Sequence, residues 1–159
     1  MPEVNLKGTV VIVDEVGAKL LTTHSKSKWA AKKINGKVYI HKQLRSGGEY
    51  VGYESLHRVL TNCPEGLMVD HVNGNTLDNR LSNLRVCNHS ENMRNRKMHK
   101  NNASGFKGVY FSKSRNKWIA QITSAGKKMT LGSFNSPEVA HNAYVLAAKK
   151  YHGEFARAA

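Results

Sequence analysis

The segment MVDHVNGNTLDNRLSNLRVCNHSENMR occupies residues 68–94, and the rest of the chain is arranged around it. Its first apolar run, Met68 to Val72, predicts a strand, which the turn-forming residues Asn73-Gly74-Asn75 end. A second short run, Leu84 to Val86, predicts another strand. A helix is then expected near His89-Ser90, with Ser90 or the preceding Asn as its N-cap. The segment therefore predicts a strand, a loop, a strand and a helix in succession.

Asp70 and His71 carry the chemistry of this segment. Neighbouring residues on a strand point to opposite sides, so the carboxylate can bind a metal ion while the imidazole acts on a water, provided that the backbone bends after His71. A histidine takes a proton near neutral pH, and a divalent ion can hold the leaving oxygen of a phosphodiester. Asn92 on the expected helix can supply a second protein oxygen. Such hard oxygen donors favour Mg²⁺ over Zn²⁺.

Spacing alone leaves the choice of asparagines open. The segment and Asn95 together contain seven asparagines, and Asn is a common turn former. By spacing, Asn79 or Asn83 in the loop could hold the ring of the base, and Asn88, Asn92 or Asn95 could act as the metal ligand.

The net charge of +14 is unevenly distributed along the chain. Residues 1–60 carry ten Lys/Arg against five Asp/Glu, residues 61–92 two against four, and residues 93–159 thirteen against two. A basic chain attracts polyanions such as nucleic acid, and the acidic window coincides with the expected metal site. An anionic membrane surface would require a basic amphipathic helix, whereas the basic residues here lie mainly on strand-like and loop segments. The expected partner is double-stranded DNA.

Length and composition exclude several other classes. The 159 residues suffice for one ordinary domain or two or three very small ones. No apolar run approaches the roughly 18 residues of a membrane span, and the first residues lack a signal-peptide core, so an intracellular protein without membrane contact is expected. The two cysteines, Cys63 and Cys87, form no CxxC pair and are interpreted as reduced thiols, so structural zinc is not expected. Oligomeric state stays open.

Residues 1–60 predict a small β-rich element that supports the central segment. The strongest local signal is Asn35-Gly36, which favours a two-residue hairpin turn. The expected elements are a strand at 9–13, one or two helical turns at 17–22, hairpin strands at 29–33 and 37–42, a strand at 50–53, and a short helix or strand end at 56–60.

The C-terminal part begins with the basic stretch RNRKMHKNNAS at residues 94–104, which predicts a linker that follows phosphates through Arg94, Arg96 and Lys97. Three strands are expected after it, at 106–112, 117–123 and 128–134. The sequence Ser136-Pro137-Glu138 predicts a helix start, and Gly153 predicts its end.

The central segment resembles the HNH nucleases of the homing-endonuclease type. The resemblance rests on Asp70, His71, Asn83 and Asn92, framed by LHR at 56–58, VDHVNGNTLDNRLSNLRVC and SEN. It implies a ββα-metal finger in which His71 is the general base, Asn83 orients the base or pins the loop, and Asp70 and Asn92 bind Mg²⁺ or Mn²⁺. The expected products are a 5′-phosphate and a 3′-hydroxyl. Many members have a His at the position of Asn92 or paired CxxC zinc sites, and this chain has neither.

Residues 104–156 resemble the plant ethylene-response-factor DNA-binding domain, in the pieces FKGV, KWIAQI, LGSF, SPEVAHNAY and AAKKYHG. The resemblance implies a three-stranded sheet on one helix, with the sheet in the DNA major groove. Such modules accompany HNH nucleases in phage and mobile-element proteins. Lys and Arg can meet phosphates, and Arg or Gln can meet base edges. The expected DNA-binding residues here are Lys107, Lys113, Arg115, Lys117, Trp118, Gln121, Thr123, Lys128 and Thr130.

Two choices within this module stay open. Trp118 fits a core position as well as a DNA-facing one. Tyr110, Ser112, Thr123 and Thr130 depart from the plant pattern, so the plant target sequence does not carry over. His57, outside the module, is interpreted as a packing or hydrogen-bonding residue.

The sequence as a whole predicts an α+β protein. Its expected parts are a β-rich support at 1–60, an HNH ββα-metal core at 61–95, a basic linker at 96–103 and an ethylene-response-factor-like domain at 104–159. The expected function is a Mg²⁺-dependent DNA endonuclease of homing type, encoded by a phage or mobile element. The alternatives are a DNA-binding regulatory protein with a decayed nuclease site and a nickase of relaxed specificity.

Overall fold

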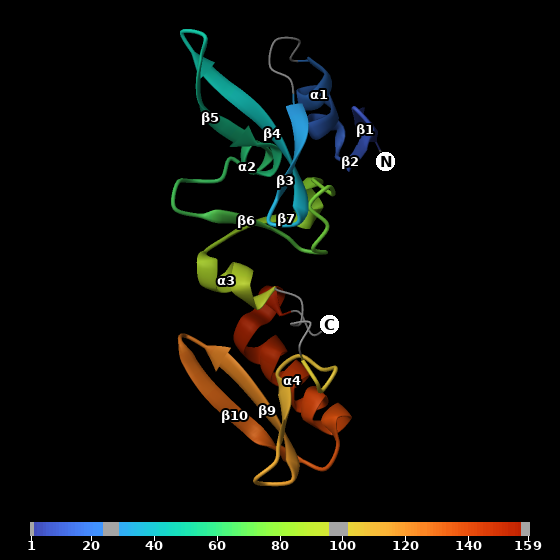
Figure 1. Cartoon of the computed structure of the whole chain (residues 1–159), viewed down its shortest axis with the longest axis vertical. Helices are drawn as coiled ribbons and strands as arrows, with labels where there is room; N and C mark the ends of the chain where they lie inside the picture. The colour runs from blue at the N-terminus through green and yellow to red at the C-terminus, as the bar shows by residue number, and fades with distance from the viewer. Residues whose placement is uncertain (1, 24–28, 96–101, 157–159) are drawn as a thin grey trace. The chain divides into compact units, whose positions relative to one another are not determined.

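The computed structural model describes residues 2–23, 29–95 and 102–156 (Figure 1). In these ranges the chain forms four small antiparallel sheets and four α-helices, which confirms the α+β class. The chain divides into two compact units, Met1–Asn92 and Met93–Ala159. None of the described helices is long and apolar enough to cross a membrane.

The first unit contains two sheets made from the N-terminal half of the chain. Its elements are β1 (Glu3–Leu6), β2 (Thr9–Ile12), α1 (Glu15–Thr23), β3 (Trp29–Ile34), β4 (Lys37–Ser46), β5 (Glu49–Ser55) and α2 (Leu56–Leu60). β1 pairs with β2, and β3, β4 and β5 form a three-stranded sheet in that order. Asn35 and Gly36 have φ angles of 49° and 80°, the positive values that a two-residue hairpin turn requires. The expected hairpin is therefore present, whereas β1 was not expected.

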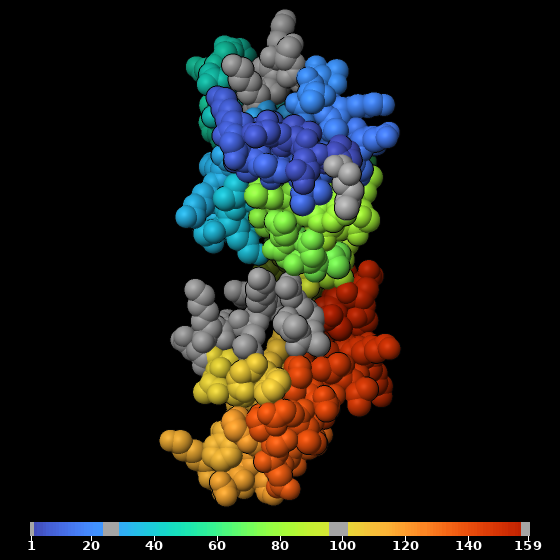
Figure 2. Space-filling view, turned by 90° about the vertical axis from the view of Figure 1, so that its right-hand side faces the viewer, coloured from blue at the N-terminus to red at the C-terminus, as the bar shows by residue number. Residues whose placement is uncertain are grey.

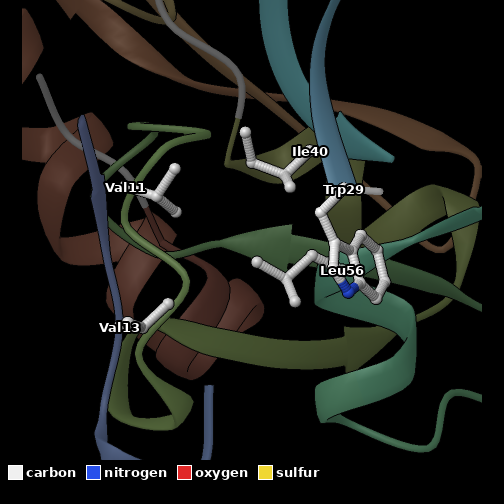
Figure 3. Packing of buried hydrophobic residues seen from close by; sticks show 5 residues of the cluster. All are labelled: Val11, Val13, Trp29, Ile40 and Leu56. Carbon is white, nitrogen blue, oxygen red and sulfur yellow. The ribbon is translucent and has the colours of Figure 1, made fainter. Parts of the chain in front are cut away.

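The core of the first unit joins four of these elements, β2, β3, β4 and α2 (Figure 3). Val11 and Val13 extend from the end of β2, Trp29 and Ile40 come from β3 and β4, and Leu56 begins α2; all five are buried and their side chains point toward one another. Burying each of these side chains contributes roughly 1.5–3 kcal/mol. The cluster fixes the first hairpin against the three-stranded sheet.

The central segment forms a hairpin followed by a helix. β6 (Met68–His71) pairs antiparallel with β7 (Leu84–Cys87), a short 3-10 turn (Leu81–Asn83) precedes β7, and α3 (His89–Arg94) follows it. Asn88 caps this helix, because its Oδ1 accepts the Glu91 N–H at 2.9 Å and its own N–H donates to Glu91 at 2.8 Å. This reciprocal pair is a capping box.

The loop between β6 and β7 is attached to the N-terminal strands. The Ile12 N–H donates to the Leu77 carbonyl at 2.9 Å, and the Asn79 N–H donates to the Ile12 carbonyl at 2.7 Å. From β4, the Val38 carbonyl accepts the Thr76 hydroxyl at 2.5 Å. In Figure 2 the blue N-terminal strands lie beside the green loop. The loop conformation thus depends on residues 38 to 67 positions earlier in the chain.

The second unit is a three-stranded sheet with one helix on it. Its elements are β8 (Val109–Ser112), β9 (Lys117–Ser124), β10 (Lys127–Phe134), α4 (Pro137–His152) and a 3-10 turn (Gly153–Phe155), with the strand order β10-β9-β8. Ser136 caps α4 by accepting the Val139 N–H at 3.3 Å. Buried Ala120 and Ala140 let the helix approach the sheet closely. β8 begins at Val109, later than expected, because Gly108 has a φ of 75° and breaks the extended backbone.

Candidate active site

His71 ends β6 with its side chain buried. Its ring lies 5.4 Å from the ring of His57 on α2 and 6.4 Å from the ring of Tyr39 on β4, centroid to centroid, with edge-to-face geometry in both pairs. The Gly74 N–H donates to the His71 carbonyl at 2.8 Å, so the chain turns directly after the strand, as expected. His57 is a packing residue, and the residue that it packs against is His71.

The surroundings of His71 favour its neutral form. Burial is the largest effect and lowers its pKa, a hydrogen bond with the Asn79 side chain and the charge of Asp70 raise it, and the charge of Lys37 lowers it. The net direction is downward. A neutral imidazole held by a hydrogen bond is the form that can accept a proton.

The sequence pattern indicated Asn79 only as an alternative to Asn83 beside His71. Its side chain is buried, bonds to His71 and also donates to the Thr76 carbonyl at 3.2 Å. The spacing of Asn79 made it a candidate, but spacing could not distinguish a side chain directed at His71 from one directed into the loop.

Asn83 closes the loop. Its Oδ1 accepts the Asn73 N–H at 3.0 Å, and its Nδ2 donates to the Asp78 carbonyl at 2.7 Å. Asp78 is buried and paired with Arg80, with Nη2 2.5 Å from Oδ2, and it also accepts from the Asn73 side chain at 2.8 Å. These hydrogen bonds lower the pKa of Asp78, the one to Arg80 most strongly. The sequence analysis did not identify Asp78 as part of this loop network.

Asp70 faces Arg85, its direct partner across the β6–β7 ladder. Nε and Nη2 of Arg85 lie 3.0 and 2.7 Å from Oδ2 of Asp70, and both side chains are largely buried. The expected metal ligand is therefore engaged by a guanidinium. The register of the two strands creates this pair, and register could not be deduced from the sequence.

Asn92 lies on α3, and its Nδ2 is 3.8 Å from the sulfur of Met68. Met68 and Asp70 are two positions apart on β6 and share a side of the strand, so Asn92 is brought to the side of Asp70. Among the described residues, no group of three or more His, Cys, Asp or Glu is arranged to hold a metal ion. A carboxylate and an amide oxygen, completed by water and phosphate oxygens, nevertheless fit the donor preference of Mg²⁺.

In the second unit, the residues expected to bind DNA fall mostly on one face. The β9–β10 register pairs Thr130 with Gln121 and Lys128 with Thr123, and directly opposed residues share a face. By alternation along β9, Lys117 shares the face of Gln121 and Thr123. Ala120 and Ile122 lie on the other face, which packs against α4. Lys113 and Arg115 lie exposed in and beside the turn after β8.

Two other residues expected to bind DNA, Lys107 and Trp118, are placed differently. Trp118 lies on the helix side of the sheet, packs against the buried cluster there, and meets Phe111 edge to face at 5.0 Å, because it alternates with Ala120. The core alternative for Trp118 is the one that the structure supports. Lys107 donates through Nζ to the Arg94 carbonyl at 2.8 Å. Arg96 and Lys97 lie outside the described residues.

Comparisons with known proteins agree with both resemblances. The family described as HNH endonuclease matches residues 61–94, and the AP2 domain family matches residues 104–154. Protein 3.8 of Escherichia phage T7 is 39% identical over 94 residues, which cover 59% of this chain and 77% of that protein. No solved structure matches the chain. The predicted architecture, an HNH domain followed by a DNA-binding domain of the ethylene-response-factor type, is confirmed.

Proposed function

The chain belongs to the same family as Protein 3.8 of phage T7 and joins an HNH endonuclease domain to an AP2 domain, and from this premise we propose that it is a metal-dependent DNA endonuclease of homing type. The observation that carries the proposal is the buried His71. Its imidazole forms a hydrogen bond with Asn79, and the preceding residue in the chain is Asp70. A base and a cation-binding group side by side match phosphodiester hydrolysis.

In this proposal His71 takes the proton from the attacking water. Asn79 holds the ring, and Asn83 keeps the loop closed behind it. Asp70 and Asn92 would hold Mg²⁺ or Mn²⁺, which would supply stabilisation of the negative charge that develops on the phosphodiester. The products are a 5′-phosphate and a 3′-hydroxyl on duplex DNA.

The remaining parts of the chain support the candidate site or bind the DNA. We assign residues 1–60 as the support of the ββα-metal finger at 61–95, with 96–103 as a basic linker to the DNA-binding domain at 104–159. The open sheet face of that domain, with Lys117, Gln121 and Lys128, contacts phosphates and base edges. The uneven charge of the chain agrees with these roles.

The test is cleavage of supercoiled plasmid by the full chain, with Mg²⁺, with Mn²⁺ or with chelator. His71→Ala is compared with His89→Ala, which removes an exposed histidine of α3. Nicked or linear product that needs both metal and His71, and that survives the His89 change, is expected. Tight DNA binding without cleavage under any metal would instead assign the chain to the DNA-binding regulators.

The pattern of products tests the finer part of the proposal. Discrete fragments from phage DNA are expected of a homing-type enzyme, and the end groups can be read by ligation before and after phosphatase treatment. A smear of products, or nicks at many positions, would indicate a nickase of relaxed specificity.

A further inference from the structure

The β3–β4–β5 sheet has two faces of different character. One face carries Trp29 and Ile40 into the core. The other, which we call the outer face, carries Tyr39 and His41 of β4, whose rings lie 6.2 Å apart. Tyr53 of β5 belongs to the outer face, because its ring meets His41 edge to face at 4.7 Å.

Cross-strand pairing assigns the basic residues to these faces. Lys32 is paired with Tyr39 and therefore lies on the outer face, and Lys37 and Arg45 share that face by alternation along β4. All three are exposed. Among the paired positions of these three strands, the outer face holds no carboxylate. The two acidic residues of β5 are paired with Lys42 and Ser46 on the opposite face: Glu54 forms an ion pair with Lys42 at 2.8 Å, and Glu49 is the partner of Ser46.

Aromatic side chains lie between these cations. Tyr53 and Tyr50 keep 49% and 56% of their surface exposed, and Tyr50 shares the outer face as the partner of Arg45. The Nζ of Lys32 lies 4.9 Å above the ring of Tyr53. Exposed aromatic rings among positive charges, without intervening carboxylates, complement the sugars and phosphates of a nucleic acid.

The outer face is continuous with the candidate active site. Tyr39 packs against both His71 and His57, and Lys37 is close enough for its charge to act on His71. From Lys37 to Arg45 the strand extends about 27 Å at about 3.4 Å per residue. That length spans about eight base pairs of duplex DNA at about 3.4 Å each.

We propose that the outer face of β3–β4–β5 binds the backbone of duplex DNA beside the phosphate to be cut. This face is formed by Lys32, Lys37, Arg45, Tyr50, Tyr53 and Gln43, the cross-strand partner of Tyr53. The inference rests on the proposed function, because it takes His71 as the place of cleavage. It assigns the first unit a DNA-binding surface of its own, in addition to that of the AP2 domain. The surface aligns the duplex with the base.

The test measures binding of the full chain to a 30-base-pair duplex by fluorescence anisotropy over a range of salt concentrations. A chelator is present, so that the result does not depend on cleavage. The variant Lys32→Ala/Arg45→Ala is compared with Lys33→Ala/Lys19→Ala, which removes the same charge from an exposed position on the opposite face of β3 and from an exposed position on α1. Each phosphate contact contributes about 0.9 to the slope of log K against log salt.

A slope lower by about 2 in the outer-face variant, with the slope of the control nearly unchanged, is expected. Equal slopes in the two variants, or no change in either, would overturn the proposal. Lysine acetylation with and without DNA gives a second reading, in which Lys32 should be protected and the neighbouring Lys33 should not. If the outer-face variant shows the lower slope but the parent chain never cleaves DNA, the inferred binding surface is supported and the proposed nuclease function is contradicted.

Discussion

Replacing His57 with Phe should make the first unit less sensitive to acid. Burial, followed by charge interactions with His71, His41 and Arg58, lowers the pKa of His57 to about 3 from its ordinary value of 6.5. The ring packs against Tyr39 and His71, contacts that a Phe ring of similar size can retain.

The magnitude follows from proton linkage. Below pH 6.5 the unfolded chain protonates His57 while the folded chain does not. The unfolded state therefore binds more protons, and the free energy of unfolding decreases as the pH is lowered. Each pH unit between the two pKa values costs about 1.4 kcal/mol. Between pH 7 and pH 5, His57 alone should therefore cost the folded state about 2 kcal/mol, and the Phe variant should be spared that loss.

The assay is urea unfolding at pH 7 and at pH 5. The chain has two tryptophans, Trp29 in the first unit and Trp118 in the second. In a Trp118→Phe background the fluorescence of Trp29 reports on the first unit alone. Unfolding free energies at the two pH values then give the acid loss for His57 and for Phe at this position.

The control is His89→Gln, which changes an exposed histidine and should leave the acid loss as it is. If the His57→Phe protein loses as much stability between pH 7 and pH 5 as its parent, within about 0.5 kcal/mol, the reasoning from burial is refuted. A larger loss in the variant would reverse the sign and refute it as well.

Three further outcomes are expected. Asn79→Leu removes the hydrogen bond that holds the base, so plasmid cleavage should slow by about 10- to 100-fold while DNA binding by anisotropy is unchanged. Gly108→Ala should destabilise the second unit by about 3 kcal/mol in urea, because the new Cβ would lie 2.1 Å from a ring carbon of Tyr144. Ser136→Ala removes the cap of α4, which accepts a backbone N–H at 3.3 Å, and should cost about 1 kcal/mol in the same titration.

Matched changes separate these causes. Gly105 also has a positive φ, of 71°, but nothing within 4 Å of its Cβ position, so Gly105→Ala should cost only about 1 kcal/mol of backbone strain. Equal losses for Gly105→Ala and Gly108→Ala would contradict the packing argument. If Asn79→Leu cleaves plasmid as fast as its parent, the hydrogen bond between Asn79 and His71 does not support cleavage.

Local patterns in the sequence predicted the elements well. Asn35-Gly36 predicted the β3–β4 hairpin because a two-residue turn with positive φ admits few residue types. Ser136 and Pro137 predicted the start of α4 because capping is a local interaction. β1 was missed, since the four residues Glu3–Leu6 acquire their strand character from pairing with β2, and such pairing leaves little trace in a short sequence.

The candidate site was predicted less completely, because its contacts join distant parts of the chain. The Asp-His pair directed attention to the end of β6, and its role in a site stays a prediction. The sequence could not show that Arg85 would face Asp70, because that contact depends on strand register. It also could not show that Asn79 and Tyr39 would contact His71, because those contacts depend on packing between elements. Trp118 illustrates the same limit: its face followed from the strand alternation only once the helix side of the sheet was known.

The attachment of the β6–β7 loop to Ile12 and Val38 has a consequence for protein engineering. A finger excised at residues 61–95 would lose the hydrogen bonds from Ile12 to Leu77 and Asn79 and the one from Thr76 to Val38. The smallest segment suited to fusion with another DNA-targeting domain is therefore residues 1–94, which contain the first unit and the whole of α3. A graft that keeps every residue of the motif but omits Ile12 and Val38 should therefore lose the geometry of the loop.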